Sequence, residues 1–121
     1  MSVISATRQI GSVTIVDFTG NIVFGEDWGL LHSLIRGLLS NGYKRIVFNL
    51  SGVDHMDSSG LSYLVTALES VRRVDGGLKL LNPTKQVLDT IRLTKLNAIF
   101  DILDEEAVAV KSFDQSAAAS A

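Results

Sequence analysis

The chain has 121 residues, of which 46% are hydrophobic and 20% are charged, so it is long enough for one sizeable core and short for two domains. Its formal net charge of −2 leaves no basic stripe to neutralise phosphates, so we expect proteins or small molecules as partners and no nucleic acid. The chain has no cysteine, which excludes disulfides and thiolate metal sites. No apolar run approaches the roughly 20 residues that cross a bilayer, and the first residues lack the pattern of a secretory signal, so we expect a cytoplasmic protein without membrane insertion.

The first third of the chain predicts two neighbouring strands and a helix. Apolar residues alternate on both sides of the turn residues Gly11 and Ser12, with Val3, Ile4 and Ala6 before the turn and Val13, Ile15, Phe18 and Ile22 after it. From residue 28 the apolar positions take helical spacing, at Leu31, Leu34, Ile35, Leu38 and Leu39. The acidic pair at 26–27 suits the start of this helix, and Asn41 suits its end.

The middle of the chain predicts a strand, a helix and a second strand. Residues 45–50 (RIVFNL) form a short, nearly continuous apolar run, which is typical of a central strand buried on both faces. One helical face follows, made of Leu61, Leu64, Val65, Leu68 and Val71. Gly76 and Gly77 end this helix, and residues 78–81 (LKLL) form the next strand.

The last third predicts shorter elements. Val87, Leu88 and Ile91 mark a short helix, and its cap is either Thr84 or Asn82, the latter with Pro83 at the first helical position. A short strand follows, made of Ile99, Phe100 and Ile102. Residues 104–113 begin acidic and continue as a terminal helix.

This order of elements predicts an α/β domain. Strands that alternate with helices after an initial strand pair imply a mixed sheet of four to five strands with about four helices packed on it. We expect one domain over residues 1–113 and a flexible or weakly helical tail over residues 114–121.

The segment DSSG, residues 57–60, stands between the predicted central strand and its helix. The simplest interpretation is a helix cap, because Asp57 or one of the serines can satisfy an amide that has no partner within the helix. Gly60 then allows a tight turn. A cap of this kind does not exclude a function for the serines.

Two chemical interpretations of this segment are weak. Ser58, His55 and Asp57 have the residue types of a nucleophilic triad, but neighbours in sequence cannot bring a base to the hydroxyl from a separate part of the fold, and the G-x-S-x-G pattern is absent. His32 lies in the first helix pattern, and we expect it to be partly exposed there. Asp54, His55 and Asp57 would have to bend sharply to share a metal ion, so we expect no metal and no cofactor.

Phosphate acceptance is the stronger alternative. A serine hydroxyl at a helix start is exposed and faces free backbone amides, and the helix dipole there favours negative charge. The DSSG segment therefore suits reversible phosphorylation of a serine.

Residues 47–65, VFNLSGVDHMDSSGLSYLV, resemble the signature of the STAS domain, and the order of elements over residues 3–113 resembles a stand-alone anti-sigma factor antagonist. The resemblance implies a protein without catalytic activity of its own that binds an anti-sigma factor with serine kinase activity. It also implies phosphorylation of Ser58, with Ser59 as second choice, which switches binding off until a serine phosphatase restores it. The implied partner-binding loop contains Asp54, Met56, Asp57, Ser58, Ser59 and Gly60, together with Phe24 and Trp28.

Two alternatives stay open at this point. Within the same fold, the chain would be a STAS accessory or scaffold subunit of another assembly, such as a lipid ABC transporter or a stressosome-like complex. Outside it, the chain would be a small serine hydrolase that uses Ser58.

The segment after the second strand departs from the family pattern. Related antagonists carry a Gly-acidic-apolar-Asp segment there, whereas the acidic residues of this chain are shifted to positions 26–27 and Trp28 is added. Phe24 and Trp28 could form an apolar contact patch beside the DSSG segment, since aromatic residues dominate interface energies. A core-edge position is the more common role for a tryptophan at the head of a helix.

Overall fold

The computed structural model describes residues 3–23 and 28–120, with side chains described as far as residue 114. The elements follow in the order β1 (Val3–Ile10), β2 (Val13–Ile22), α1 (Trp28–Ser40), β3 (Arg45–Met56), α2 (Ser58–Arg73), β4 (Gly77–Leu81), α3 (Lys85–Leu93), a 3-10 helix (Leu96–Ala98), β5 (Asp101–Leu103) and α4 (Glu106–Ser120). None of the described helices is both long enough and apolar enough to cross a membrane.

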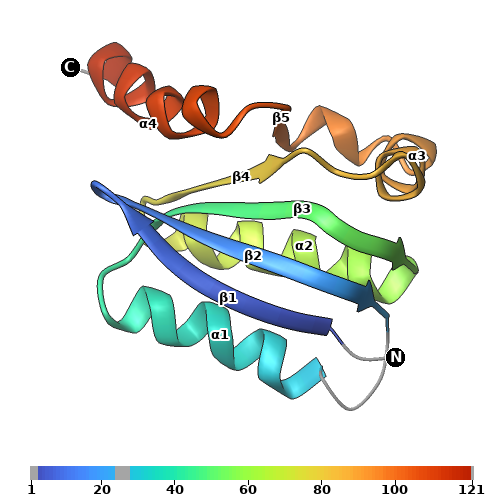
Figure 1. The fold of residues 1–121 in the computed structure, drawn as a ribbon. Coiled ribbons are helices and arrows are strands. Elements are labelled where there is room, and N and C mark those ends of the chain that lie inside the picture. The colour runs from blue at the N-terminus through green and yellow to red at the C-terminus, as the bar shows by residue number, and fades with distance from the viewer. Residues whose placement is uncertain (1–2, 24–27, 121) are drawn as a thin grey trace.

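The five strands form one mixed sheet in the order β1-β2-β3-β4-β5 (Figure 1). β1 and β2 form an antiparallel hairpin, and each later strand is parallel to its neighbour. Parallel neighbours need a crossover connection, and α1, α2 and α3 lie in these connections. The predicted α/β fold with a mixed sheet is therefore confirmed.

Side chains of the sheet alternate between two hydrophobic clusters. Val16, Phe18 and Phe48 belong to the larger cluster, which also contains residues of α1, α2 and α3. Ile15 and Val47 point the other way, into a smaller cluster with Ala109 and Phe113 of α4. The sheet therefore has a face covered by α1 and α2 and a face covered in part by α4.

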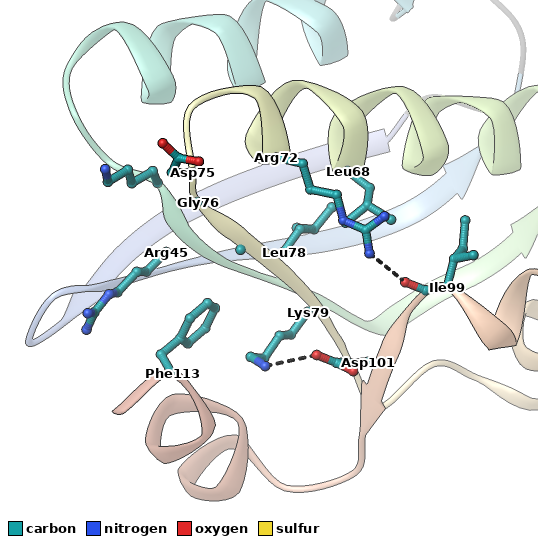
Figure 2. Close-up of a pocket in the computed structure, with 12 residues that line it drawn as sticks. Arg45, Leu68, Arg72, Asp75, Gly76, Leu78, Lys79, Ile99, Asp101 and Phe113 are labelled. Carbon is teal, nitrogen blue, oxygen red and sulfur yellow. Dashed lines mark hydrogen bonds and ion pairs between the residues drawn. The ribbon is translucent and has the colours of Figure 1, made fainter. Parts of the chain in front are cut away.

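β3 is the central strand that positions the DSSG segment. Ile46, Val47, Phe48 and Leu50 are fully buried, which confirms the prediction of a strand buried on both faces. The strand is longer than predicted, because β2 continues to pair with it as far as Met56. The start of β3 lies at the far end of the sheet, where it lines a cavity (Figure 2).

The side chains of Thr84, which precedes α3, and of Gln86 in α3 bind the edge of β3 where β4 no longer pairs with it. β4 pairs with β3 from Arg45 to Asn49 only. Beyond this point the Thr84 hydroxyl donates to the Val53 carbonyl at 2.9 Å. The amide of Met56 donates to Gln86 Oε1 at 2.9 Å, and Gln86 Nε2 donates to the Met56 carbonyl at 3.3 Å. Gln86 thus satisfies the strand edge as a neighbouring strand would.

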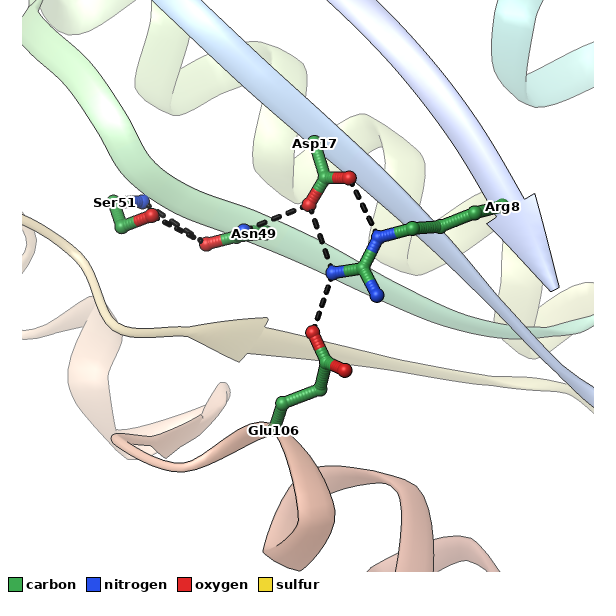
Figure 3. A network of polar contacts seen from close by, with 5 residues as sticks. All are labelled: Arg8, Asp17, Asn49, Ser51 and Glu106. Carbon is green, nitrogen blue, oxygen red and sulfur yellow. Dashed lines mark hydrogen bonds and ion pairs between the residues drawn. The ribbon is translucent and has the colours of Figure 1, made fainter. Parts of the chain in front are cut away.

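A polar network on the α4 face connects β1, β2, β3 and α4 (Figure 3). Arg8 donates to both carboxylate oxygens of Asp17, at 2.7 and 3.1 Å, and also donates to Glu106. Asn49 Nδ2 donates to Asp17 at 2.7 Å, and Asn49 Oδ1 accepts from Ser51. The hydrogen bonds from Arg8 lower the pKa of Asp17 and of Glu106, and the same contacts raise the pKa of Arg8.

Several element ends differ from the sequence-based expectation. Thr84 is the N-cap of α3, as one of the two alternatives predicted, although its hydroxyl bonds Val53 and not a helix amide. The last strand begins at Asp101, because Leu96–Ala98 form a 3-10 turn and the chain reaches β4 only after Phe100. The helix of α4 continues to Ser120, where alanine-rich sequence favours helix, so the predicted tail is largely helical.

Candidate partner-binding site

Asp57 directly precedes α2 and caps the helix with its side chain. The residue has extended backbone geometry, with φ −97° and ψ −174°, and its Oδ1 accepts a hydrogen bond from the Gly60 amide at 2.9 Å. The Asp57 carbonyl accepts the next amide, that of Leu61, at 3.1 Å. This is the geometry of an aspartate N-cap, and it fixes the first turn of α2 immediately after the buried end of β3.

Gly60 lets this first turn lie directly against β2. A Cβ atom at this position would lie 2.1 Å from the Ile22 carbonyl oxygen and 2.7 Å from Met56 Cγ. Both distances are far shorter than any van der Waals contact, and the first is to backbone, which cannot rotate away. Glycine is therefore required here by close approach.

Ser58 is the exposed residue of the pair. It is the first residue of α2 and is exposed, whereas Ser59 is half-buried. The Ser58 carbonyl accepts a hydrogen bond from the Ser62 hydroxyl at 3.0 Å. Within the described chain, neither the Ser58 hydroxyl nor the amides of Ser58 and Ser59 have a hydrogen-bond partner, so donors for an anionic group stand next to an accessible oxygen.

The remaining residues of the predicted loop are divided between surface and core. Asp54 and His55 are exposed, and they belong to β3 and not to a loop. Met56 is 1% exposed and lies in the larger hydrophobic cluster, so its predicted place on the contact surface is wrong. The prediction took β3 to end at residue 50, and the longer strand carries Met56 into the core.

Trp28 is half-buried at the edge of the larger cluster. Its ring packs edge-to-face with His32 at 5.1 Å and with Tyr63 at 6.1 Å between centroids. This matches the core-edge interpretation of Trp28 and the partly exposed position expected for His32. Phe24, the other half of the predicted apolar patch, lies outside the described residues.

Tyr63 and Gln86 support the site although the sequence patterns did not single them out. The Tyr63 hydroxyl is buried and donates to the Leu31 carbonyl of α1 at 2.9 Å, and burial raises its pKa. Its ring stacks on Phe48 of β3 at 6.0 Å between centroids. Gln86 holds the backbone of Met56, the residue before the cap. The hydrogen bonds of Tyr63 and Gln86 each join residues about 30 positions apart in sequence, which a local pattern does not reveal.

The described residues do not assemble the geometry that a nucleophilic serine or a metal site would need. No described histidine hydrogen bonds to Ser58, so a base for a nucleophilic hydroxyl is not assembled within the described chain. The side chains of residues 3–23 and 28–114 contain no group of three or more histidines or carboxylates that could hold a metal ion.

Comparisons with known proteins agree on one family. The model of the STAS domain matches residues 5–109. A candidate anti-sigma factor antagonist of Thermotoga neapolitana is 36% identical over 66 residues, and a similarly named protein of Thermotoga maritima is 35% identical over 66 residues. These matches cover 54% of this chain and 58% of either relative, so the chain spans less than two thirds of their length.

Solved structures share the fold at low identity. An anti-sigma factor antagonist from Mycobacterium paratuberculosis superimposes with a TM-score of 0.80 at 20% identity, covering 92% of this chain and 93% of that one. The unphosphorylated anti-sigma factor antagonist SpoIIAA gives 0.74 at 16% identity, covering 93% and 97%. A match over residues 5–109 on a five-stranded sheet with this shared fold shows that the chain belongs to the STAS domain family.

Proposed function

We propose that this protein is an anti-sigma factor antagonist that binds an anti-sigma factor with serine kinase activity, and that phosphorylation of Ser58 switches binding off. The observation that carries the proposal is the exposed Ser58 hydroxyl at the first position of α2, beside two backbone amides without partners in the described chain. Relatives that are named anti-sigma factor antagonists support the role, and one structure of the same fold, SpoIIAA, was determined in a phosphorylated form.

The contact surface of the proposed complex is the start of α2 and the end of β3. Asp54, Ser58 and Ser59 offer polar groups there, and the half-buried edge of Trp28 offers apolar surface. Asp57 and Gly60 act indirectly, because they fix the first turn of α2 and so the direction of the Ser58 hydroxyl.

Phosphorylation acts at the interface and leaves the free domain folded. The phosphate adds about 1.5 to 2 negative charges near pH 7. The free amides and the helix dipole favour this charge by about 0.3 to 1 kcal/mol, whereas the carboxylates of Asp54 and Asp57 oppose it. The two effects are similar in size, so the stability of the isolated domain changes little.

The complex responds more strongly than the free domain. A partner surface shaped for a hydroxyl has to exclude the phosphate or bury it without enough cations, and an unpaired charge in an interface costs about 2 to 5 kcal/mol. Affinity therefore falls roughly thirty-fold to several thousand-fold, because about 1.4 kcal/mol corresponds to a factor of ten.

The test combines phosphosite mapping with binding. The host's anti-sigma factor kinase and ATP are expected to place one phosphate on Ser58, and titration of that kinase with the modified chain should show the loss of affinity. Ser58→Asp should weaken binding less than phosphate does, and Ser58→Ala should bind constitutively. Ser62→Ala is the matched control, since Ser62 is exposed one helical turn later and contacts Ser58 only through its carbonyl.

Four results would contradict the proposal. Phosphate on Ser59 alone would place the switch one residue later. Equal affinity of the modified and unmodified chains would exclude the interface mechanism. No phosphate with any host kinase would favour an accessory or scaffold role in another assembly, and ester turnover that Ser58→Ala abolishes would favour the hydrolase.

A further inference from the structure

A cavity of about 550 Å³ lies at the opposite end of β3 from Ser58. It is bounded by the start of β3 and β4, the C-terminal part of α2, the chain before β5, and Phe113 of α4 (Figure 2). Its volume falls in the range of small-molecule sites, about 300 to 1,000 Å³. The proposed switch at Ser58 makes no use of this cavity.

The cavity is locally cationic in a chain whose net charge is −2. Four cations and two carboxylates line it, namely Lys44, Arg45, Arg72 and Lys79 against Asp75 and Asp101. Asp114, outside the lining, lies 3.6 Å from Arg45 and compensates part of its charge, so the site keeps a smaller positive excess carried by Lys44, Arg72 and Lys79. This excess favours an anionic ligand, because charge of one sign in a recessed site attracts and concentrates the opposite charge.

Lys79 supplies a buried charge in the wall of the cavity. The residue is 7% exposed, and its Nζ donates to Asp101 at 3.0 Å and lies 4.9 Å from the centre of the Phe113 ring. The Asp101 side chain is itself 71% exposed. An ammonium group has three donors, and in the described chain Asp101 uses one of them. A second anion near Nζ would add to the compensation of this buried charge.

Arg72 has donors left over for a ligand. Its Nη2 donates to the Ile99 carbonyl at 3.4 Å, a long bond, and the guanidinium carries five donors in a planar fork. Figure 2 shows Arg72 and Lys79 reaching from α2 and β4 toward the same short segment, Ile99 to Asp101. A planar fork of this kind matches the oxygens of a phosphate or carboxylate.

The rest of the wall is apolar. Leu68, Leu78, Ile99 and the Phe113 ring line the cavity beside these cations. Gly77 keeps space next to the ring, because a Cβ there would lie 3.0 Å from Phe113 Cε1. The lining therefore offers one apolar side, with an aromatic face, and one cationic side.

We propose that this cavity binds a small aromatic anion. The aromatic ring packs against Phe113 and the neighbouring aliphatic side chains, and the phosphate or carboxylate group accepts hydrogen bonds from Arg72 and Lys79. No covalent step is involved. The site is independent of Ser58 and of the partner that binds there.

Phenyl phosphate, benzoate and phenol are the probes, and the full chain labelled with ¹⁵N is the protein. Titration with phenyl phosphate or benzoate should shift the amide resonances of Gly76, Gly77, Lys79 and Ile99 in a saturable way, with a Kd of about 1 mM, or about −4 kcal/mol. The stronger of the two anions identifies the preferred acid group. Phenol should bind at least about ten-fold more weakly, since it lacks the charge.

Arg72→Gln tests the role of the fork. The variant should weaken binding of the preferred anion about ten-fold with an unchanged thermal midpoint, as Arg72 is exposed. Arg36→Gln on α1 is the matched control, because it removes the same charge from an exposed arginine whose side chain donates to Ser33 and does not line the cavity. Lys44→Gln provides a second lining variant with a smaller expected loss.

Three outcomes would overturn the proposal. The first is that neither anion produces saturable shifts at the cavity. The second is that phenol binds as tightly as the anions. The third is that Arg36→Gln weakens binding as much as Arg72→Gln. The loss of affinity would then come from the net charge of the protein and not from the position of Arg72 in the cavity.

Discussion

The two faces of the sheet hold their helices by different means. The face under α1 and α2 is a continuous apolar cluster with large rings, among them Phe18, Phe48 and Tyr63, all nearly inaccessible to solvent. The face under α4 has a smaller cluster and relies in addition on charged groups that solvent reaches, with Arg8 at its centre.

This difference affects how the start of α2, which carries Ser58, and the contacts of α4 should respond to substitution and to solution conditions. The start of α2 is fixed by close packing and by hydrogen bonds to backbone, so its geometry should depend on volume and hardly at all on pH. The contacts of α4 include surface ion pairs, which contribute about 0 to 1 kcal/mol each and are screened by salt. Substitutions on the two faces should therefore change the free energy of unfolding by different amounts, and only those on the α4 face should depend on pH and salt.

The largest effect is expected for Gly60→Ala. The added methyl would lie 2.1 Å from the Ile22 carbonyl oxygen, so the first turn of α2 has to move away from β2. We expect a loss of about 3 kcal/mol or more in the free energy of unfolding, at the upper end of overpacking effects. Denaturant unfolding of the variant measures this loss.

Gly37→Ala is the matched control for that experiment. Gly37 lies in α1, and a Cβ there would meet no atom within 4 Å. Because alanine favours helix over glycine, this variant should be more stable by about 0.5 to 1 kcal/mol. Equal effects of the two substitutions would show that helix propensity, and not the approach of α2 to β2, decides the result.

Gln86→Ala should have the next largest effect. The variant removes both hydrogen bonds to the Met56 backbone and leaves a strand edge without partners. We expect a loss of about 1 to 3 kcal/mol in stability. Hydrogen exchange of the Met56 amide should also accelerate, because its acceptor is gone. Lys85→Ala, at the exposed neighbouring position, should leave both quantities nearly unchanged.

The sequence predicted those parts of the site that depend on neighbours in the chain. A helix cap within the DSSG segment, by Asp57 or by one of the serines, follows from residue types within four positions; the cap is confirmed, and the structure shows that Asp57 makes it, with α2 beginning at Ser58. The central position of β3 follows from a local run of β-forming residues and is also confirmed. These features need no knowledge of which elements pack together.

The parts that the sequence did not reveal depend on the topology. Gln86 meets Met56 only because α3 follows β4 back to the free edge of β3. The pairing of β2 with β3 contains register shifts between Asp17 and Thr19 and between Gly20 and Asn21. The local pattern therefore predicts a strand only as far as residue 50, and the predicted surface position of Met56 is wrong because the longer strand carries this residue into the core.

Tyr63→Phe should have a smaller effect on the same face. The substitution keeps the ring that stacks on Phe48 and removes the hydroxyl that donates to the Leu31 carbonyl. Leaving this buried carbonyl without its donor should cost about 1 to 2 kcal/mol. Thermal and denaturant unfolding measure the loss, and Tyr43→Phe, at a position that is 45% exposed, should cost nearly nothing. A similar loss in both variants would contradict the role of the Leu31 contact.

The smallest effect is expected on the other face, for Arg8→Gln, and it should depend on pH. Hydrogen bonds from Arg8 lower the pKa of Asp17 and of Glu106 in the folded protein, so folding favours their ionised forms. This stability is fully present above the ordinary carboxylate pKa, about 4, and is lost as pH falls through the lowered values of the folded protein. The three side chains are 31 to 41% exposed, so solvent screens the contacts and the loss in the variant should not exceed about 1 kcal/mol near pH 7.

The difference in the free energy of unfolding between Arg8→Gln and the wild-type chain should therefore shrink as the pH is lowered from 7 toward about 2. It should also shrink at about 1 M salt, where the Debye length is only about 3 Å. Denaturant unfolding at several pH values measures this difference. Arg36→Gln is again the control, since that guanidinium meets Ser33 and neither carboxylate of the network, and its effect should be small at every pH. A loss in Arg8→Gln that stays constant across the pH range would show that the aliphatic stem of Arg8 stabilises this face by packing, and that its charge contributes little.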